Sequence, residues 1–313
     1  MPAIVTHDQF GREALTKPYA SFLASKREQK AFRLGNQGPD PLFYCVANPA
    51  LASYGHLGSQ MHHERPAAFL CALHRNLSYL PAAARPVARA WAAGFVCHYL
   101  LDRTAHPLVY AQERALCAAG VDGLTERDGS EVHAIIESTI DEVMLFTRTG
   151  KTTASLRPRC AAPHCDARSL AAISYLVTLA VEDVYHLAVR PDLFAKSVRA
   201  FRAVDGLVFK SPSGRKRAVL GRIERVFRPH SFIQAMTPRD VQATSCEFNN
   251  HEHAAWENPF THAISTDSFF DLFAKAQDEA ARAVPLFLSD GFDEEAAHSI
   301  TCGLDFSGEP IEK

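Results

Sequence analysis

The sequence lacks any apolar run that approaches the ~20 residues of a membrane-spanning helix. It also lacks an N-terminal basic segment followed by an apolar core, which is the pattern of a secretory signal. Lysine and arginine (33) nearly balance aspartate and glutamate (35), so the net charge gives no argument for a nucleic-acid partner. These absences predict a soluble, cytoplasmic protein without a transmembrane segment.

Convincing strand hairpins, internal repeats and low-complexity linkers are missing as well. Helical periodicity recurs along the chain instead, and 313 residues suffice for one large domain or two ordinary ones. The simplest prediction is an all-α fold with a single domain over residues 1–313.

Eight cysteines do not predict a disulfide framework here, because no export signal is visible and several lie in helical apolar patterns. We expect most of them to be small, reduced core residues. Cys160, His164 and Cys165 supply only three ligands at a spacing that matches no tight zinc knuckle, so an ordinary loop is favoured over a second metal site.

Histidine is abundant, with 15 copies, and it forms part of a stripe of ligand-type residues within residues 94–110. His98, Asp102 and His106 are four residues apart, which puts them on one face of a helix. Imidazole nitrogen and carboxylate oxygen are the donors of a zinc site, and an Asp between two His can serve two ions. The alternative is three separately hydrogen-bonded core groups.

A second stripe follows about thirty residues later, where His133, Glu137 and Asp141 again have helical spacing. Two such stripes on neighbouring helices are harder to explain by chance than one. Facing helices can build a multinuclear site in a bundle core. We therefore expect a multi-helix bundle with a metal cluster in a central cleft.

Further ligand-type residues lie between the first predicted helices. Residues 34–44 contain two Gly and two Pro, which exclude a regular helix and put Asp40 on a stiff turn. Asp40 is either a turn former or a carboxylate aimed at a metal. His56, His62 and His63 follow, and the adjacent pair cannot both face the same side of a helix.

Two later segments carry other chemistry. Residues 210–228 are strongly basic and either meet phosphate groups or form a solvated face. Residues 246–262 contain His251, His253 and Trp256 in an Asn-rich loop that either lines the cleft mouth or lies on the surface.

Seven segments, spread over nearly the whole chain, form a recognisable combination: THDQFG, LGNQGPDPLFY, LGSQMHHE, GFVCHYLLDRTAHP, EVHAIIESTIDE, HAAWENPFTH and DSFFDLFAKA. Together they resemble the bacterial zinc-dependent phospholipase C family, whose wider group includes the single-strand-specific zinc nucleases. The resemblance implies a helical bundle with a trinuclear zinc cleft that hydrolyses phosphodiesters.

The resemblance also implies roles for individual residues. The implied zinc ligands are His7, Asp40, His62, His98, Asp102, His106, His133 and Glu137, with His56 as an alternative to His62. Asp102 is implied to bridge two zinc ions, and Asp40 is the candidate general base, so these two are the expected catalytic residues. Asp141, His63 and Trp256 are expected to support the ligands or to contact substrate. In the secreted members a freed N-terminal residue binds one zinc, whereas this chain starts MPAIVTH, so two or three ions are expected.

The activity so implied is hydrolysis of a phospholipid or another small phosphodiester by metal-bound hydroxide. Residues 210–228 are a candidate for peripheral membrane contact, and nucleic acid is the less favoured substrate. The alternatives are a nuclease, or a nucleotide phosphodiesterase or phosphatase, on the same zinc scaffold. A metal-binding scaffold protein without hydrolytic activity is the remaining alternative.

Overall fold

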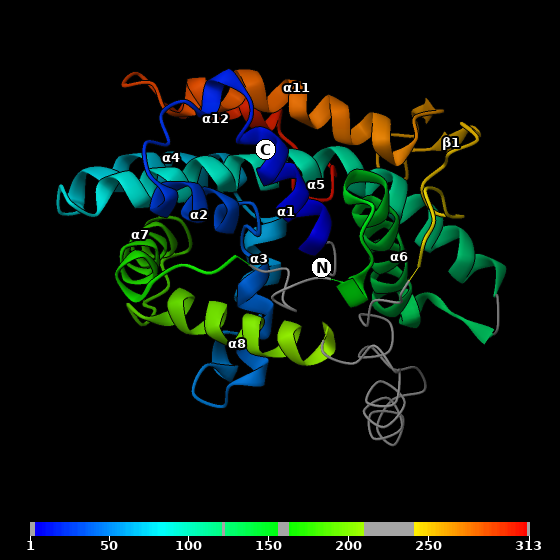
Figure 1. Ribbon diagram of the computed structural model, residues 1–313, viewed down its shortest axis with the longest axis horizontal. Coiled ribbons are helices and arrows are strands. Elements are labelled where there is room, and N and C mark those ends of the chain that lie inside the picture. Colours follow the sequence, from blue (N-terminus) through cyan, green and yellow to red (C-terminus); the bar gives the residue numbers. More distant parts are fainter. Residues whose placement is uncertain (1–3, 121–122, 156–162, 210–240, 312–313) are drawn as a thin grey trace. The chain divides into compact units, whose positions relative to one another are not determined.

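The computed structural model describes residues 4–120, 123–155, 163–209 and 241–311, and these residues are mostly helical (Figure 1). The all-α class predicted from the sequence is therefore confirmed. The α-helices are α1 (Ile4–Ala14), α2 (Lys26–Gly35), α3 (Leu57–His63), α4 (Pro66–Asn76), α5 (Arg85–Ala119), α6 (Gly129–Thr149), α7 (Ala167–Tyr185), α8 (Leu193–Phe209), α11 (Phe269–Phe287) and α12 (Glu294–Thr301). Short 3-10 helices are η1 (Pro18–Ala20), η2 (Asp40–Ala47), η3 (Ala52–Tyr54), η4 (Leu77–Tyr79), η6 (Glu126–Asp128) and η7 (Thr153–Ser155).

The chain forms two compact units, each assembled from three separate stretches. Unit 1 contains residues 1–9, 105–161 and 203–272, and unit 2 contains residues 10–104, 162–202 and 273–313. Helix α5 contributes its first part, up to Thr104, to unit 2 and the rest to unit 1. The single domain over residues 1–313 and the central cleft stay predictions.

Unit 2 is built around the first part of α5, and in it α4 packs against α7 and α12 (Figure 1). Trp91 and Phe95 of α5 are buried, and their rings contact Phe194 of α8 and Phe69 of α4. A Cβ on Gly94 would lie 2.1 Å from the carbonyl oxygen of Phe32, so α2 approaches α5 more closely than any larger residue would allow. This approach brings the loop after α2 to the ligand-bearing face of α5.

Unit 1 contains α6, the end of α5 and a small hairpin. The prediction that the chain lacks hairpins was wrong, because β1 (Trp256–Glu257) pairs antiparallel with β2 (Ile264–Ser265). The strands are only two residues long, and the turn between them is closed by bonds of the Asn258 backbone rather than by a typical Gly-containing turn. Such a short pair leaves almost no period-two pattern in a sequence.

The described cysteines are all free, and most of them are buried, which agrees with the expectation of reduced core residues. Within the described ranges, no helix combines the length and the hydropathy needed to cross a bilayer. The loop of Cys160 lies outside the described residues, while His164 is exposed and Cys165 is buried.

Candidate metal centre

The first group of ligand-type side chains is in unit 2 and consists of His62 on α3 with His98 and Asp102 on α5. Their ligand atoms all lie within 4.8 Å of one another, and all three residues are buried. The His98 Nε2 atom is 3.1 Å from Asp102 Oδ2, and the His62 Nε2 atom is 3.8 Å from the same oxygen. The i, i+4 stripe predicted on α5 thus meets a histidine from a second helix.

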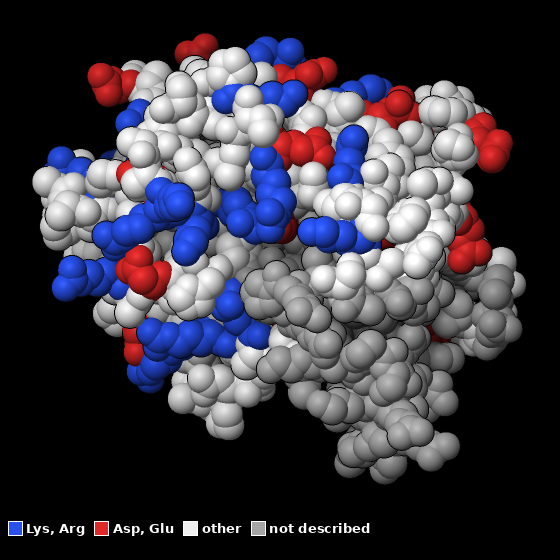
Figure 2. Space-filling model, viewed as in Figure 1, with Lys and Arg blue, Asp and Glu red and all other residues white. Residues whose placement is uncertain are grey.

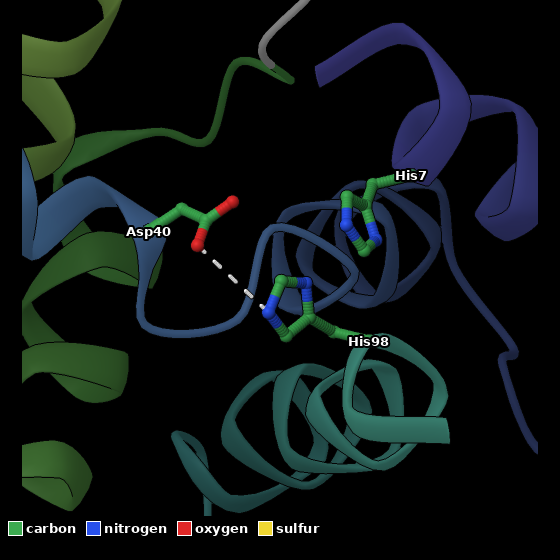
Figure 3. Close-up of side chains that lie close together, drawn as sticks. All are labelled: His7, Asp40 and His98. Atoms are coloured by element: carbon green, nitrogen blue, oxygen red, sulfur yellow. Dashed lines mark ion pairs between the residues drawn. The ribbon is translucent and has the colours of Figure 1, made fainter. Parts of the chain in front are cut away.

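Asp40, the first residue of η2, extends this group with a second carboxylate. Its Oδ1 atom lies 3.2 Å from His62 Nε2 and 3.9 Å from His98 Nε2, and Figure 3 shows Asp40 facing His98. The Asp40 side chain is buried. Of the two interpretations of Asp40, a carboxylate aimed at a metal position fits this arrangement.

The ring orientation of both histidines is fixed by backbone carbonyls. His62 Nδ1 bonds to the Gly58 oxygen at 2.7 Å, and His98 Nδ1 bonds to the Asn36 oxygen at 3.0 Å. Because a carbonyl oxygen only accepts, each Nδ1 donates, and in a neutral ring the Nε2 lone pair then points at the carboxylates. The contact between an Nε2 lone pair and a carboxylate is repulsive, and either a proton on Nε2 or a cation between the two atoms makes it attractive. The donors present therefore fit a zinc ion, which takes imidazole nitrogen and carboxylate oxygen.

The turn between α2 and η2 is shaped by Gly38. This residue has φ of +47°, and a Cβ on it would lie 2.1 Å from the His98 ring. Only glycine meets both the left-handed conformation and the close approach. The turn is therefore pressed against His98, with Asn36 on one side and Asp40 on the other.

The second group is in unit 1 and consists of His106 on α5 with His133 and Glu137 on α6. Glu137 Oε1 lies 3.2 Å from His106 Nε2 and 3.4 Å from His133 Nε2, and Glu137 is buried. The other ring nitrogen of His133, Nδ1, forms a hydrogen bond with Glu113 Oε2 at 2.9 Å. A carboxylate behind a histidine directs the other ring nitrogen toward a metal and raises its basicity.

Two aromatic rings, those of Tyr110 and Phe260, pack beside this second group. The ring of Tyr110 is centred 4.9 Å from that of His133 and 6.0 Å from that of His106. The ring of Phe260, from the turn of the hairpin, packs edge-on against Tyr110 at 5.4 Å. Arg114 lies over the Phe260 ring at 4.9 Å and donates to the Pro259 oxygen, which fixes the turn on α5.

Charge within each group keeps the ligand carboxylates ionised. Burial acts to raise the pKa of Asp40, but His98 and His62 outweigh it and lower the pKa. Burial is likewise outweighed at Glu137, where His133 and His106 help to hold the pKa well below its usual value. An ionised carboxylate is the form that binds a cation.

Comparison with protein families gives a match to the model of zinc dependent phospholipase C over residues 6–169. The matched region covers more than half of the chain and includes every ligand-type residue described above. The chain belongs to this family. No curated protein and no solved structure shows a significant match. Members of the zinc-dependent phospholipase C family hydrolyse phosphodiesters, so the protein is a zinc-dependent hydrolase of phosphoric ester bonds.

Not every residue predicted for the phospholipase C site joins the two groups. His56 is exposed at the start of α3, so the structure places His62, and not its alternative, beside the carboxylates. His63 turns away and bonds to Asp305 at 2.9 Å. Trp256 lies in the hairpin and donates to the Asp267 oxygen at 3.0 Å. The basic residues 210–228 lie outside the described residues.

Asp141 belongs to neither ligand group, and its carboxylate bonds to the start of α1. It accepts the backbone N–H groups of Val5 and Thr6 at 3.0 and 2.8 Å, which caps the start of that helix. Burial raises the pKa of Asp141 to about 8, and Glu137 adds to the rise. The helix that it caps carries His7, which is buried and is also drawn in Figure 3. The role of His7 as a ligand stays a prediction.

Residue-by-residue inspection of the sequence missed Glu113, Tyr110 and Phe260. Tyr110 is four residues and Glu113 seven residues after His106, so the helical face that carries the first stripe also includes both. That spacing could have indicated that Tyr110 and Glu113 lie close to the metal ligands. Phe260 had no comparable spacing, because its contact with Tyr110 joins residues 150 positions apart.

Proposed function

We propose that this member of the family is a phospholipase C-like enzyme that cleaves a phospholipid or a related small phosphodiester. The observation that carries the proposal is that, in each of two groups, histidine Nε2 atoms face a buried carboxylate. Both groups lie in the region that the family model matches. A bound zinc ion would satisfy both the imidazole nitrogens and the carboxylates without a proton on the rings.

The proposed zinc ligands are the predicted set. His62, His98, Asp102 and Asp40 would hold zinc in unit 2, with Asp102 as the candidate bridge between ions. In unit 1, His106, His133 and Glu137 would hold another ion, and His7 is the ligand proposed from α1. Two or three zinc ions per chain follow from this set.

Zinc, when bound, polarises phosphoryl oxygens and lowers the pKa of water toward ~7. A side chain of the protein would carry out the proton transfers. Asp40 is ionised at neutral pH, so it can accept a proton from attacking water and later return it to the leaving alcohol. Water adds to phosphorus, and the bond between phosphorus and the glycerol oxygen breaks. The products are a phosphorylated headgroup and a diacylglycerol-type alcohol.

Metal content and hydrolysis test the proposal together. We expect two or three zinc ions per chain by elemental analysis, and hydrolysis of phosphatidylcholine that a chelator abolishes and zinc restores. A folded chain without stoichiometric metal would contradict the metal sites. Full zinc content without hydrolysis of any lipid, nucleotide or oligonucleotide phosphodiester would favour the scaffold alternative.

Two histidine variants make a matched pair for this test. His62→Asn removes a buried group at the carboxylates and should lower both zinc content and hydrolysis. His56→Asn changes an exposed residue six positions earlier and should leave both unchanged. Loss of zinc in His56→Asn, with zinc retained in His62→Asn, would show that His56 and not His62 is the ligand.

A further inference from the structure

Unit 2 carries a strongly basic face outside the metal centre. Its six cations come from two helices: Lys26, Lys30 and Arg33 of α2, and Lys196, Arg199 and Arg202 of α8. In each helix the spacing of three or four residues puts the cations on one side. Figure 2 shows Lys and Arg side chains gathered over these two helices.

The two sets of cations converge on the segment around Cys165. Burial raises the pKa of the Cys165 thiol to about 12, whereas Lys30, Arg202 and Arg33 all act to lower it. One cation from α8 and two from α2 are therefore close enough to influence the same side chain. These cations of α2 and α8 therefore act on one part of unit 2.

Carboxylates near this face are already engaged. Asp166 is paired with Arg27 at 3.0 Å, and Asp192 is paired with Arg190 and Lys196. Glu28 accepts from the Ser25 hydroxyl at 2.6 Å. Among the described residues, neither Lys30 nor Arg199 has an ion-pair partner. Lys30 and Arg199 therefore keep positive charge on the face that no described carboxylate pairs.

Element η2 contacts α8 and carries one exposed apolar side chain. The Tyr44 ring of η2 packs at 4.9 Å against Phe201, the neighbour of Arg202 in α8. Two residues beyond Tyr44, the Val46 side chain is 67% exposed. The same 3-10 helix begins at Asp40, the proposed proton acceptor. The basic face thus includes a helix that contacts an element of the metal centre.

We propose that this basic face docks the enzyme on an anionic phospholipid surface. The inference rests on the proposed function, because the docked lipid layer would also hold the substrate. Lysine and arginine bind anionic lipid through charge, and an exposed apolar side chain beside them suits the headgroup boundary. The neighbouring aromatic residues Phe32 and Phe201 are buried, so neither can stack on the bases of a single-stranded nucleic acid.

Vesicle binding by the full, zinc-loaded chain tests the proposal. We expect tighter binding to vesicles of phosphatidylcholine mixed with phosphatidylglycerol than to vesicles of phosphatidylcholine alone, and weaker binding as salt increases. The double variant Lys30→Glu, Arg199→Glu should bind the mixed vesicles at least about 25-fold more weakly, since loss of each cation costs about fivefold near an anionic surface and the added carboxylates are repelled by it. The matched control is Lys151→Glu, Arg282→Glu, which reverses two exposed cations outside the face and should bind normally.

Hydrolysis of a water-soluble phosphodiester separates this inference from the proposed function. The double variant should keep that activity, because neither residue belongs to the ligand groups. Equal binding to both vesicle types, or equal loss in the control, would overturn the docking face. Oligonucleotide binding that needs Lys30 and Arg199, without vesicle binding, would overturn it in favour of nucleic acid. Charge-dependent vesicle binding without any phosphodiester hydrolysis would support the face and contradict the proposed function.

Discussion

Replacing Gly38 with alanine should disable the metal centre through a single added methyl group. The new Cβ would lie 2.1 Å from the His98 ring, and the ring must retreat by more than 1 Å to reach an ordinary contact distance. That movement separates His98 Nδ1 from the Asn36 oxygen and moves Nε2 away from Asp102. A misplacement of about 1 Å in a catalytic group can cost about 100-fold in rate. We expect a loss of that order in phosphodiester hydrolysis, together with loss of zinc by elemental analysis.

Gly150→Ala is the matched control for this variant. Gly150 ends α6 with φ of +63°, and no atom lies within 4 Å of the position of an added Cβ. Both variants incur about 1–2 kcal/mol for an alanine in the left-handed region, and Gly38→Ala adds the cost of displacing the His98 ring, as measured by urea unfolding of the metal-free protein. Only Gly38→Ala should also lose zinc. Wild-type zinc content and rate in Gly38→Ala, with the same destabilisation in both variants, would refute the role of the turn.

Three further variants test individual contacts. Asp102→Asn preserves shape but removes the shared carboxylate, so at least one zinc ion should be lost; unchanged metal content would contradict the bridging assignment. Glu113→Gln weakens the support behind His133 and should lower zinc affinity of the second group about 10–100-fold, as read by chelator competition; an unaltered competition curve would show that Glu113 is not needed. Phe260→Ala removes the ring that packs on Tyr110 and should weaken the same site without changing the first; loss at both sites would indicate general unfolding instead.

The sequence was sufficient to predict the parts of the site that follow from helical periodicity. His98 with Asp102, and His133 with Glu137, are pairs one helical turn apart, so their shared face needs no knowledge of tertiary structure. The turn at Asp40 was also predictable, because Gly and Pro restrict the backbone of residues 34–44. The helical class followed from the same periodicity.

Contacts between distant segments could not be predicted in this way. The carbonyl of Asn36 orients His98 because Gly94 lets α2 approach α5, and this packing depends on backbone shape rather than on a ligand motif. Asp141 matched the ligand spacing on α6, but its carboxylate instead caps α1. Spacing alone does not distinguish a ligand from a cap, because both functions need a buried carboxylate that faces donors or cations.

The two ligand groups each contain or contact two carboxylates, but these carboxylates are placed differently around the histidines. In unit 2, Asp40 and Asp102 both face the histidine nitrogens, and the rings are oriented by uncharged carbonyls. In unit 1 only Glu137 faces the nitrogens, and the second carboxylate, Glu113, stands behind His133. A carboxylate in that position offsets cationic charge without occupying a ligand place. If each group held one ion, the second would offer it three protein ligands and the first four, so the second would leave more room for a phosphate oxygen of the substrate.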